Sequence, residues 1–168
     1  IPVITFASER LGKKNTFLAS QAVSIAGYAL FWWSFQPENP MLMLLPLPLF
    51  AFGIGGLFTP MTSMTADVCD LYKLNTGSRR EGTFGAIYWW MVKFGFAAAG
   101  GLSGLIMALV GFVADAPAQA EGVMTGMRLA YSLVPITGAL LAIAVMWTYD
   151  VTEERAYEIR AELEKRHG

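Results

Sequence analysis

The chain has 168 residues, of which 55% are hydrophobic and only 15% are charged, and its formal net charge is -1. A soluble domain carries about a quarter charged residues, so this chain has too few charges to cover the surface of a soluble domain of its size. The small net charge also provides no basic surface for nucleic acid. The composition therefore favours a membrane protein and excludes a nucleic-acid partner.

The first residues indicate a chain that begins inside a longer protein. Residues 1–7 are apolar but far too short to cross a membrane, and the chain starts at Ile1 rather than at a methionine. We expect this segment to be the end of a helix whose start is missing, which makes the chain a C-terminal fragment. A polar loop centred on Gly12 is predicted at residues 8–15.

Four apolar runs follow, at residues 16–35, 41–65, 83–113 and 127–149. The first run is 20 residues long, which at about 1.5 Å per residue matches a hydrocarbon core of about 30 Å. Prolines and glycines interrupt the second run, and Pro135 interrupts the fourth. In lipid, packed neighbours satisfy the backbone groups that such residues free, so we predict kinked transmembrane helices.

Two polar segments complete the organisation of the chain. Residues 67–82 are predicted to form a second polar loop. In the tail at 150–168, Glu alternates with Arg and Lys while Ala156 and Ile159 share helical spacing, which is the pattern of an amphipathic helix outside the membrane. We therefore divide the chain into transmembrane helices at 1–149 and an amphipathic tail.

The basic residues are distributed unevenly between the two sides of the predicted helices. Of the 12 Lys and Arg residues, only Arg128, at the start of the fourth run, lies on one side, and only Lys93 lies deep inside an apolar run. Cytoplasmic segments are enriched in Lys and Arg, so the loops at 8–15 and 67–82 are predicted to be cytoplasmic. We expect a multi-pass protein of the inner cell membrane with a cytoplasmic C-terminal tail.

Residues for catalysis or metal binding are scarce. The chain has one cysteine, Cys69, and one histidine, His167, which lies in the tail. No pair of carboxylates lies within the apolar runs, and a catalytic metal would lack ligands. We therefore expect neither an enzyme nor a bound metal or cofactor.

Lys93 is the one charge deep inside an apolar run. It follows Thr83, where that run begins, by about 15 Å of helix, which places it near the bilayer midplane. Small residues recur on its helical face at Ala97, Gly100 and Gly104, so this face is predicted to contact protein or a cavity. A charge there costs about 2.5 to 3.5 kcal/mol on insertion scales and marks a functional site by default. The alternatives are a lysine that snorkels to the interface or one that only pairs with a buried carboxylate.

Three aromatic residues, Tyr88, Trp89 and Trp90, precede Lys93 by one to two helical turns. Such a group is either a packing cluster or a platform on which a sugar ring stacks. Together with Lys93 it forms the predicted site for substrate and cation.

Four charged residues are predicted to form a cytoplasmic gate. Asp67 and Asp70 are three residues apart and share one helical face, and they lie where the second span is predicted to end. Carboxylates at a helix C-terminus oppose the helix dipole and need nearby cations, for which Arg79 and Arg80 are the candidates. The alternative to an ion-pair gate is a solvated charged turn that only sets topology. The same two interpretations apply to the charged residues of the first loop, which are Glu9, Arg10, Lys13 and Lys14.

Two motifs in this region resemble a known family. The run A-D-V-C-D-L-Y-x-x-N-T-G-S-R-R-E-G at 66–82, followed by G-x-x-Y-W-W-x-V-K-F-G at 85–95, is similar to the glycoside-pentoside-hexuronide:cation symporters. These proteins are the melibiose-permease-like branch of the major facilitator superfamily. The basic loop at 9–14 and the segment from Gly126 through Pro135 resemble other parts of the same family. The resemblance covers almost all of the chain up to the tail.

The resemblance implies a fold and a mechanism for the whole protein. The chain would hold helices nine to twelve of a twelve-helix, all-α major-facilitator fold, with substrate near the midplane between two six-helix halves. Lys93 matches the lysine on the family's eleventh helix that lies by the sugar and cation sites. Tyr88 and Trp89 replace polar side chains of the melibiose permeases, which favours proton coupling, or none, over sodium. The family's acidic cation ligands lie in the N-terminal half, outside this chain.

The sequence thus predicts a secondary active transporter that moves a glycoside, pentose or hexuronide, coupled to H+ or Na+, by alternating access. Its partners would be the sugar, the coupling cation, the lipid bilayer and the missing N-terminal half of the same chain. Animal relatives in the family carry lysolipids, so a non-sugar solute is one alternative. A non-transporting membrane scaffold or assembly subunit is another, although it would not explain Lys93.

Overall fold

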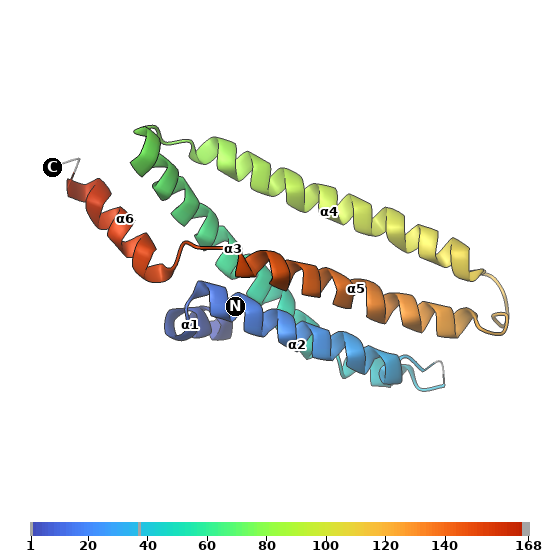
Figure 1. Cartoon of the computed structure of the whole chain (residues 1–168). Helices are drawn as coiled ribbons and strands as arrows, with labels where there is room; N and C mark the ends of the chain where they lie inside the picture. The colour runs from blue at the N-terminus through green and yellow to red at the C-terminus, as the bar shows by residue number, and fades with distance from the viewer. Residues whose placement is uncertain (1, 37, 166–168) are drawn as a thin grey trace.

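The structure, a computed structural model, describes residues 2–36 and 38–165. The described residues form six α-helices and one short 3-10 helix, with no strand among them. Figure 1 shows α5 between α2 and α4, with α3 crossing behind α2 and α5, and α6 beside the far end of α3. In chain order the elements are α1 (Pro2–Leu11), α2 (Lys13–Ser34), η1 (Pro40–Leu44), α3 (Leu47–Thr76), α4 (Glu81–Val110), α5 (Val123–Trp147) and α6 (Glu153–Lys165).

The closest packing joins α2 to α3, where small residues let the two backbones approach. A Cβ atom at Gly53 would lie 1.6 Å from Ser24 Oγ, and one at Gly56 would lie 2.1 Å from Ser20 Cβ. Gln21 Nε2 also donates to the Gly53 carbonyl at 3.4 Å. Larger residues would force the helices apart, so these glycines determine how closely α2 and α3 pack.

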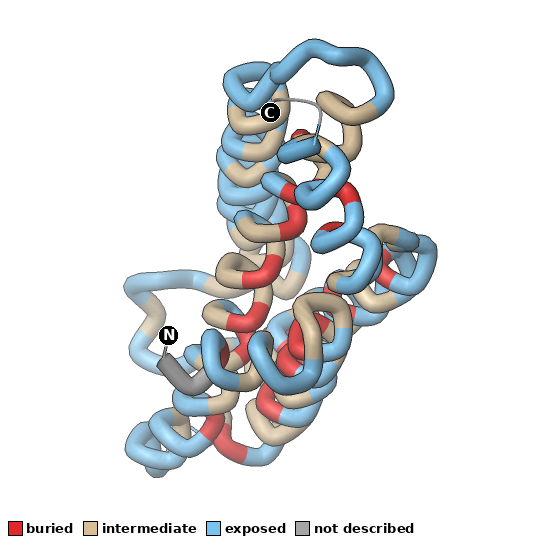
Figure 2. Tube along the Cα trace, turned by 90° about the vertical axis from the view of Figure 1, so that its left-hand side faces the viewer, coloured by how far each residue is buried: buried red, intermediate tan, exposed pale blue. Residues whose placement is uncertain are grey.

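The hydrophobic core lies where α5 joins this pair of helices. Phe17 of α2, Met64 of α3 and Met146 of α5 form one buried cluster. Figure 2 shows that buried positions concentrate on the inner faces of the helices. The core is therefore small and serves to hold α2, α3 and α5 together.

The second predicted span, at 41–65, is divided in the structure. Its start forms the separate helix η1, and α3 begins only at Leu47. Pro46 immediately precedes α3, and Pro48 lies in its first turn. Proline lacks the N–H group that a helix interior needs and is tolerated at a helix start, which explains why the regular helix begins there.

The first predicted polar loop, at 8–15, is reduced to one residue. α1 ends at Leu11 and α2 begins at Lys13, so only Gly12 separates them. Gly12 has a φ of 81°, a conformation that glycine adopts without steric cost. The charged residues on either side of it are therefore helical.

The second predicted polar loop, at 67–82, is also mostly helical. α3 continues to Thr76 and ends at Gly77, whose left-handed backbone, with a φ of 72°, lets its N–H donate to the Lys73 carbonyl. Asp67 and Asp70 thus lie inside α3 rather than at its end, contrary to the sequence prediction. No helix-breaking residue precedes Gly77 in this stretch, and polarity alone does not end a helix.

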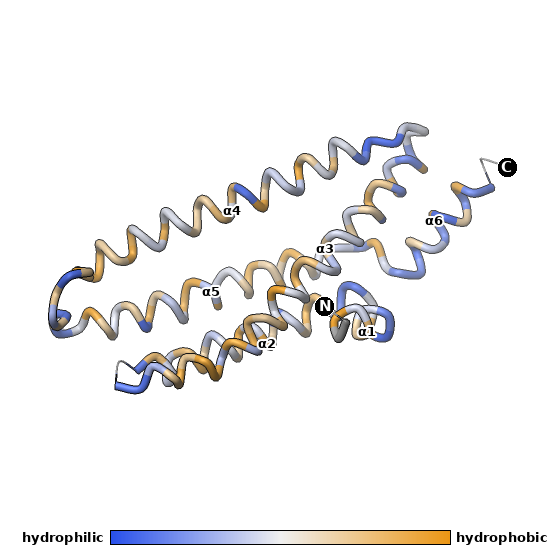
Figure 3. Tube along the Cα trace, turned by 180° about the vertical axis from the view of Figure 1, so that it is seen from behind, coloured by the Kyte–Doolittle hydropathy of each residue, from blue (hydrophilic) through white to orange (hydrophobic). Residues whose placement is uncertain are grey.

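Three helical segments are long and apolar enough to cross a membrane, namely Pro40–Thr76, Glu81–Val110 and Val123–Trp147. They correspond to three of the four predicted spans. Within the described residues, α2 does not meet this criterion, because serine and glutamine side chains along it lower its mean hydropathy. Figure 3 shows hydrophobic residues along the long helices and hydrophilic residues at several connections and in α6.

α4 is the least covered helix of the structure. None of its residues is buried within the described part of the chain, and Figure 1 shows its first half diverging from α5. No described atom lies within 4 Å of a Cβ placed at Gly100 or Gly104. The close helix contact expected at this small-residue face is therefore not made by the described residues.

The tail forms α6, which packs on the end of α3 that lies away from α5. Ala156 and Ile159 are buried, and Ile159 is only 1% exposed. Thr152 Oγ1 accepts a hydrogen bond from the Arg155 N–H at 3.2 Å and so caps the helix start. The rest of the predicted tail, at 166–168, lies outside the described residues.

Candidate functional site

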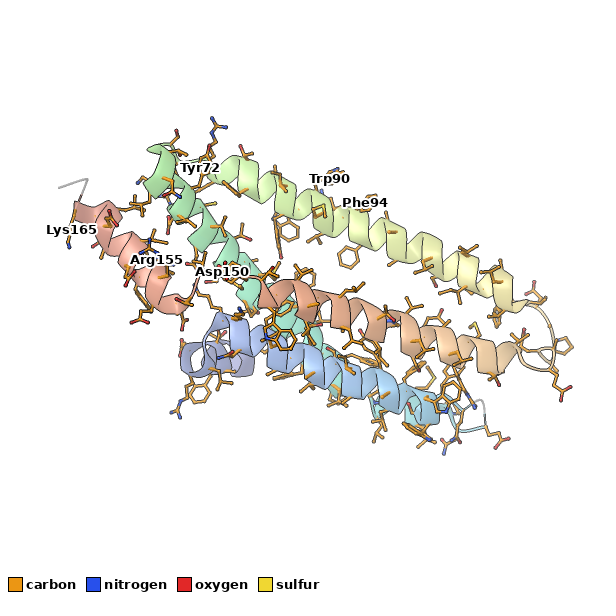
Figure 4. The ribbon with its side chains drawn as sticks, in the orientation of Figure 1. Tyr72, Trp90, Phe94, Asp150, Arg155 and Lys165 are labelled. Atoms are coloured by element: carbon orange, nitrogen blue, oxygen red, sulfur yellow. The ribbon has the colours of Figure 1, made fainter. Side chains whose placement is uncertain are left out.

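The predicted substrate and cation residues lie in the first half of α4. Trp90 stacks on Phe94 with ring centroids 5.7 Å apart (Figure 4), and Tyr88 meets Trp89 edge-on at 5.4 Å. Trp89 and Trp90 are nevertheless 56% and 64% exposed. Broad aromatic surface on α4 is thus open to a ligand, to lipid or to another part of a larger protein.

Lys93 is exposed on the same helix. Among the residues that the structure describes, it has neither an ion-pair nor a hydrogen-bond partner. Because α4 is long and apolar enough to span a membrane, an unpaired ammonium group in its middle is costly. We therefore expect a ligand or a residue outside the described chain to compensate this charge.

A cavity of about 450 Å³ lies where the first turns of α4 face α3 and the end of α5. Tyr88 and Tyr149 line it, and in the described structure both hydroxyl oxygens are buried without a hydrogen-bond partner. Such groups cost free energy unless a polar group meets them. The other lining residues are mainly apolar, and they are Met61, Met64, Thr65, Val68, Phe84, Ile87, Val145, Met146 and Thr148.

Tyr149 connects this cavity to the charged end of the structure. It follows α5 directly, and burial together with the negative charge of Asp67 raises the pKa of Tyr149 to about 12. The phenol therefore stays protonated and available as a hydrogen-bond donor. Tyr88 is the only predicted substrate-site residue among the described residues that line the cavity.

Asp67 is the centre of a cluster of ion pairs formed by three helices. Its carboxylate, in a side chain only 2% exposed, accepts hydrogen bonds from Lys13 Nζ at 2.5 Å and from Arg160 at 2.6 Å. Arg160 Nε also lies 3.5 Å from Asp70 Oδ2. Two cations balance two carboxylates, which offsets the cost of removing Asp67 from water. Lys13 comes from α2, the aspartates from α3 and Arg160 from α6.

Lys14 lies next to this cluster and binds the end of α5. Its Nζ donates to the Trp147 carbonyl at 3.0 Å and to the Tyr149 carbonyl at 2.8 Å. Carbonyls at a helix C-terminus have no partner within the helix, and a cation there is also favoured by the helix dipole. Lys13 and Lys14 thus connect the start of α2 to α3 and α5.

Arg79 and Arg80 do not pair with the aspartates, contrary to the sequence prediction. Arg79 Nε donates to Glu81 at 2.7 Å, and this contact raises the pKa of Arg79. The Arg80 guanidinium lies over the Tyr72 ring, 5.8 Å from its centroid. The reason is the length of α3, because Asp67 lies about 15 Å of helix before the connection that carries the two arginines.

Two predicted residues of the first loop, Glu9 and Arg10, also lie outside the cluster, whereas Lys13 of the same loop belongs to it. The Arg10 guanidinium stacks over the Phe6 ring, 4.7 Å from its centroid, and Glu9 is exposed. Arg160 is the cluster residue that sequence reasoning missed. Its only signal was its place beside Ile159 on the amphipathic tail, which indicates a helix face but not the partner of that face.

The helices and their apolar segments define a multi-pass α-helical membrane protein. Residues 1–153 match the family model described as MFS/sugar transport protein. The chain therefore belongs to this family, in its branch of glycoside-pentoside-hexuronide:cation symporters. Its relatives are transporters rather than enzymes.

Three relatives illustrate this membership. The glucuronide carrier protein homolog of Escherichia coli K12 is 32% identical over 165 residues, which cover 98% of this chain and 36% of that protein. The isoprimeverose transporter of Lactiplantibacillus pentosus is 26% identical over 168 residues, or 100% of this chain and 35% of that protein. The sodium-dependent lysophosphatidylcholine symporter 1-A of Danio rerio is 29% identical over 104 residues, or 61% of this chain and 20% of that protein.

The chain spans about a third of the length of the curated relatives that it matches over its whole length. No solved structure matches it. The match to the family model ends at residue 153, where α6 begins.

Proposed function

We propose that the protein containing this chain is a secondary active transporter that carries a sugar together with a cation by alternating access. Family membership supports the class of activity. The observation that carries the proposal is Lys93, a charge in the middle of an apolar helix that has no partner among the described residues and lies beside exposed aromatic rings. A relative named for glucuronides and another named for isoprimeverose support a glycoside, pentose or hexuronide as substrate.

The residues of α4 would divide the work at the central site. Lys93 supplies positive charge to a hexuronide carboxylate or to acidic cation ligands elsewhere in the protein. Trp89 and Trp90 offer flat faces on which a sugar ring can stack. Tyr88 offers a hydroxyl without a partner in the described structure. Because Tyr88 and Trp89 supply no anionic oxygen, we propose H+ rather than Na+ as the coupling ion.

We also propose that Asp67 and Asp70 belong to a cytoplasmic gate. The concentration of basic residues at their end of the helices supports this orientation. Their partners in such a gate are Lys13, which pairs with Asp67 at 2.5 Å, and Arg160, which lies 2.6 Å from Asp67 and 3.5 Å from Asp70. Asp70→Asn should then slow turnover more than it weakens substrate binding, and an unchanged turnover number would favour a purely topological role.

The test uses the full-length protein reconstituted in lipid vesicles. A radiolabelled glucuronide and radiolabelled isoprimeverose are offered separately, with an imposed H+ gradient, an imposed Na+ gradient or neither. We expect one of the sugars to accumulate when the H+ gradient is present. Absence of accumulation of either sugar under all three conditions would contradict the proposal.

Lys93→Ala separates the central site from general helix damage. We expect this variant to lose gradient-driven accumulation while inserting into the membrane normally. Met91→Ala is the matched control, since Met91 is 55% exposed on the same helix and carries no charge. Normal gradient-driven accumulation of the sugar by Lys93→Ala would show that Lys93 has no role in transport.

An amphipathic solute is the second candidate substrate. The apolar cavity between α3, α4 and α5 favours it, and one relative is named as a lysophosphatidylcholine symporter. Uptake of labelled lysophosphatidylcholine by the same vesicles, without uptake of either sugar, would establish this alternative.

A further inference from the structure

α6 combines two features that are unusual for a tail. It begins where the match to the family model ends, yet its Ile159 is among the most deeply buried side chains of the structure. Arg160, the next residue, reaches Asp67 across 93 positions of sequence. The tail is therefore attached to α3 by an apolar contact and a charged contact side by side.

The two cations that share Asp67 are not equivalent. The Lys13 side chain is 17% exposed, whereas that of Arg160 is 45% exposed. Water can therefore hydrate Arg160 when it leaves, at a lower cost than for Lys13. When Arg160 leaves, Asp67 keeps Lys13, so no buried carboxylate is left without a partner.

There is also space beside Arg160 into which it can move. A cavity of about 290 Å³ adjoins it, lined by Asp70, Lys73, Arg79, Leu163 and Glu164 as well as by Arg160 itself. The walls carry charges of both signs, so a guanidinium group remains solvated and compensated there. Arg160 can thus be released without entering an apolar environment.

We propose that α6 is a latch and that Arg160 is the positioning residue that fastens it to Asp67 and Asp70 of α3. With the latch closed, α6 and α2 hold the same carboxylate, and this end of α3 is fixed to both helices. With the latch open, the Asp67 carboxylate keeps Lys13 as its only cation among the described residues, and this end of α3 is freer to move. The control of turnover by the latch rests on the proposed transport function, whereas the attachment itself does not.

The attachment is tested by a distance measurement on the full-length protein. Nitroxide labels are placed at Lys73→Cys on α3 and Glu164→Cys on α6, in a Cys69→Ser background. We expect one short distance in the parent, and a second, longer distance when Arg160→Gln is added. Arg155→Gln is the matched control, because among the described residues Arg155 forms its ion pair within α6, with Glu158 at 2.8 Å. A single, unchanged distance in Arg160→Gln would overturn the latch.

Arg160→Lys tests whether the effect of Arg160→Gln comes from the lost charge rather than from misfolding. It keeps one cation for Asp67 but loses the second contact to Asp70, since lysine lacks the fork of the guanidinium group. We therefore expect a long-distance population between those of the parent and of Arg160→Gln. A long-distance population in Arg160→Lys as large as that in Arg160→Gln would show that the charge does not fasten the tail.

Control of turnover is tested by kinetics in the same vesicles, with whichever sugar the parent accumulates. We expect Arg160→Gln to change the maximal rate by about threefold or more while KM changes by less than about twofold, because the latch acts on a conformational step. Arg155→Gln should change neither value. Equal changes in both constants, or no change, would leave α6 as a static support and overturn its control of turnover. If the parent transports nothing, the proposed function fails, and the distance measurement still decides the attachment.

Discussion

Glycines lie both at the interface between α2 and α3 and on one face of α4, but only those at the interface pack against another helix in the described structure. At Gly53 and Gly56 an added Cβ would collide with serine side chains of α2, whereas at Gly100 and Gly104 no described atom lies within 4 Å. Described residues thus fill the space beside the glycines between α2 and α3, but not the space beside those on α4. A small-residue face therefore marks where a helix is able to pack, and the structure shows that only one of the two faces is occupied by described residues.

The charged residues differ between these two regions in the same way. Asp67, on the packed side, is met by two cations at 2.5 and 2.6 Å. Lys93, on the open side, has no partner among the described residues. Both charges lie in segments apolar enough to span a membrane, so the difference between them lies in what surrounds each side chain and not in the helix that carries it.

The largest effect on stability is expected from Asp67→Asn. It removes the carboxylate that binds two cations and leaves Lys13 largely buried without a counter-ion, which should cost about 3 kcal/mol. The measurement is the thermal midpoint of the detergent-solubilised full-length protein. Asp115→Asn, in the exposed connection between α4 and α5, is the control. A loss below about 1 kcal/mol would mean that the cluster behaves as an exposed ion pair.

The next largest loss of stability is expected from Gly53→Val, which we compare directly with Gly104→Val. Overpacking at Gly53 should cost about 1 to 3 kcal/mol, because Ser24 Oγ occupies the space that the new side chain needs. Gly104→Val should cost much less if its face meets lipid. Equal losses of thermal stability in the full-length protein would show that a part of that protein beyond the described residues covers α4.

A smaller effect is expected where the packed side meets the end of α5. Lys14→Ala removes the two donors to the Trp147 and Tyr149 carbonyls and should cost about 0.5 to 1 kcal/mol. Lys14→Arg should restore most of the thermal stability because it keeps a cation near the helix C-terminus. Equal thermal stability of the alanine and arginine variants would show that water satisfies these carbonyls as well as a cation does.

The smallest effect is expected from Arg79→Gln. Arg79 is 54% exposed, and its ion-pair partner in the described part of the chain is Glu81, itself 59% exposed, so solvent screens the interaction. We expect no measurable shift in the thermal midpoint. A shift in the thermal midpoint as large as that of Lys14→Ala would support the sequence prediction that Arg79 pairs with the aspartates.

Much of the architecture follows from local sequence. The four apolar runs are occupied by long helices, the motif at 66–95 indicated the family, and the periodicity of the tail predicted α6. The predicted loops are too long, because the polar residues around Gly12 and before Gly77 continue helices. Polarity shows where a helix leaves lipid, and a left-handed glycine shows where it ends.

The helices, the apolar segments that can span a membrane, and the position of Lys93 and the aromatic residues on one helix follow from local sequence. Helical periodicity and hydropathy are local properties of the chain. The partners of Asp67, which are Lys13 and Arg160 rather than Arg79 and Arg80, depend instead on tertiary packing. A carboxylate attracts whichever cation the packing brings within reach, and that packing depends on the small residues between α2 and α3 and on the docking of Ile159, which bring together residues far apart in sequence.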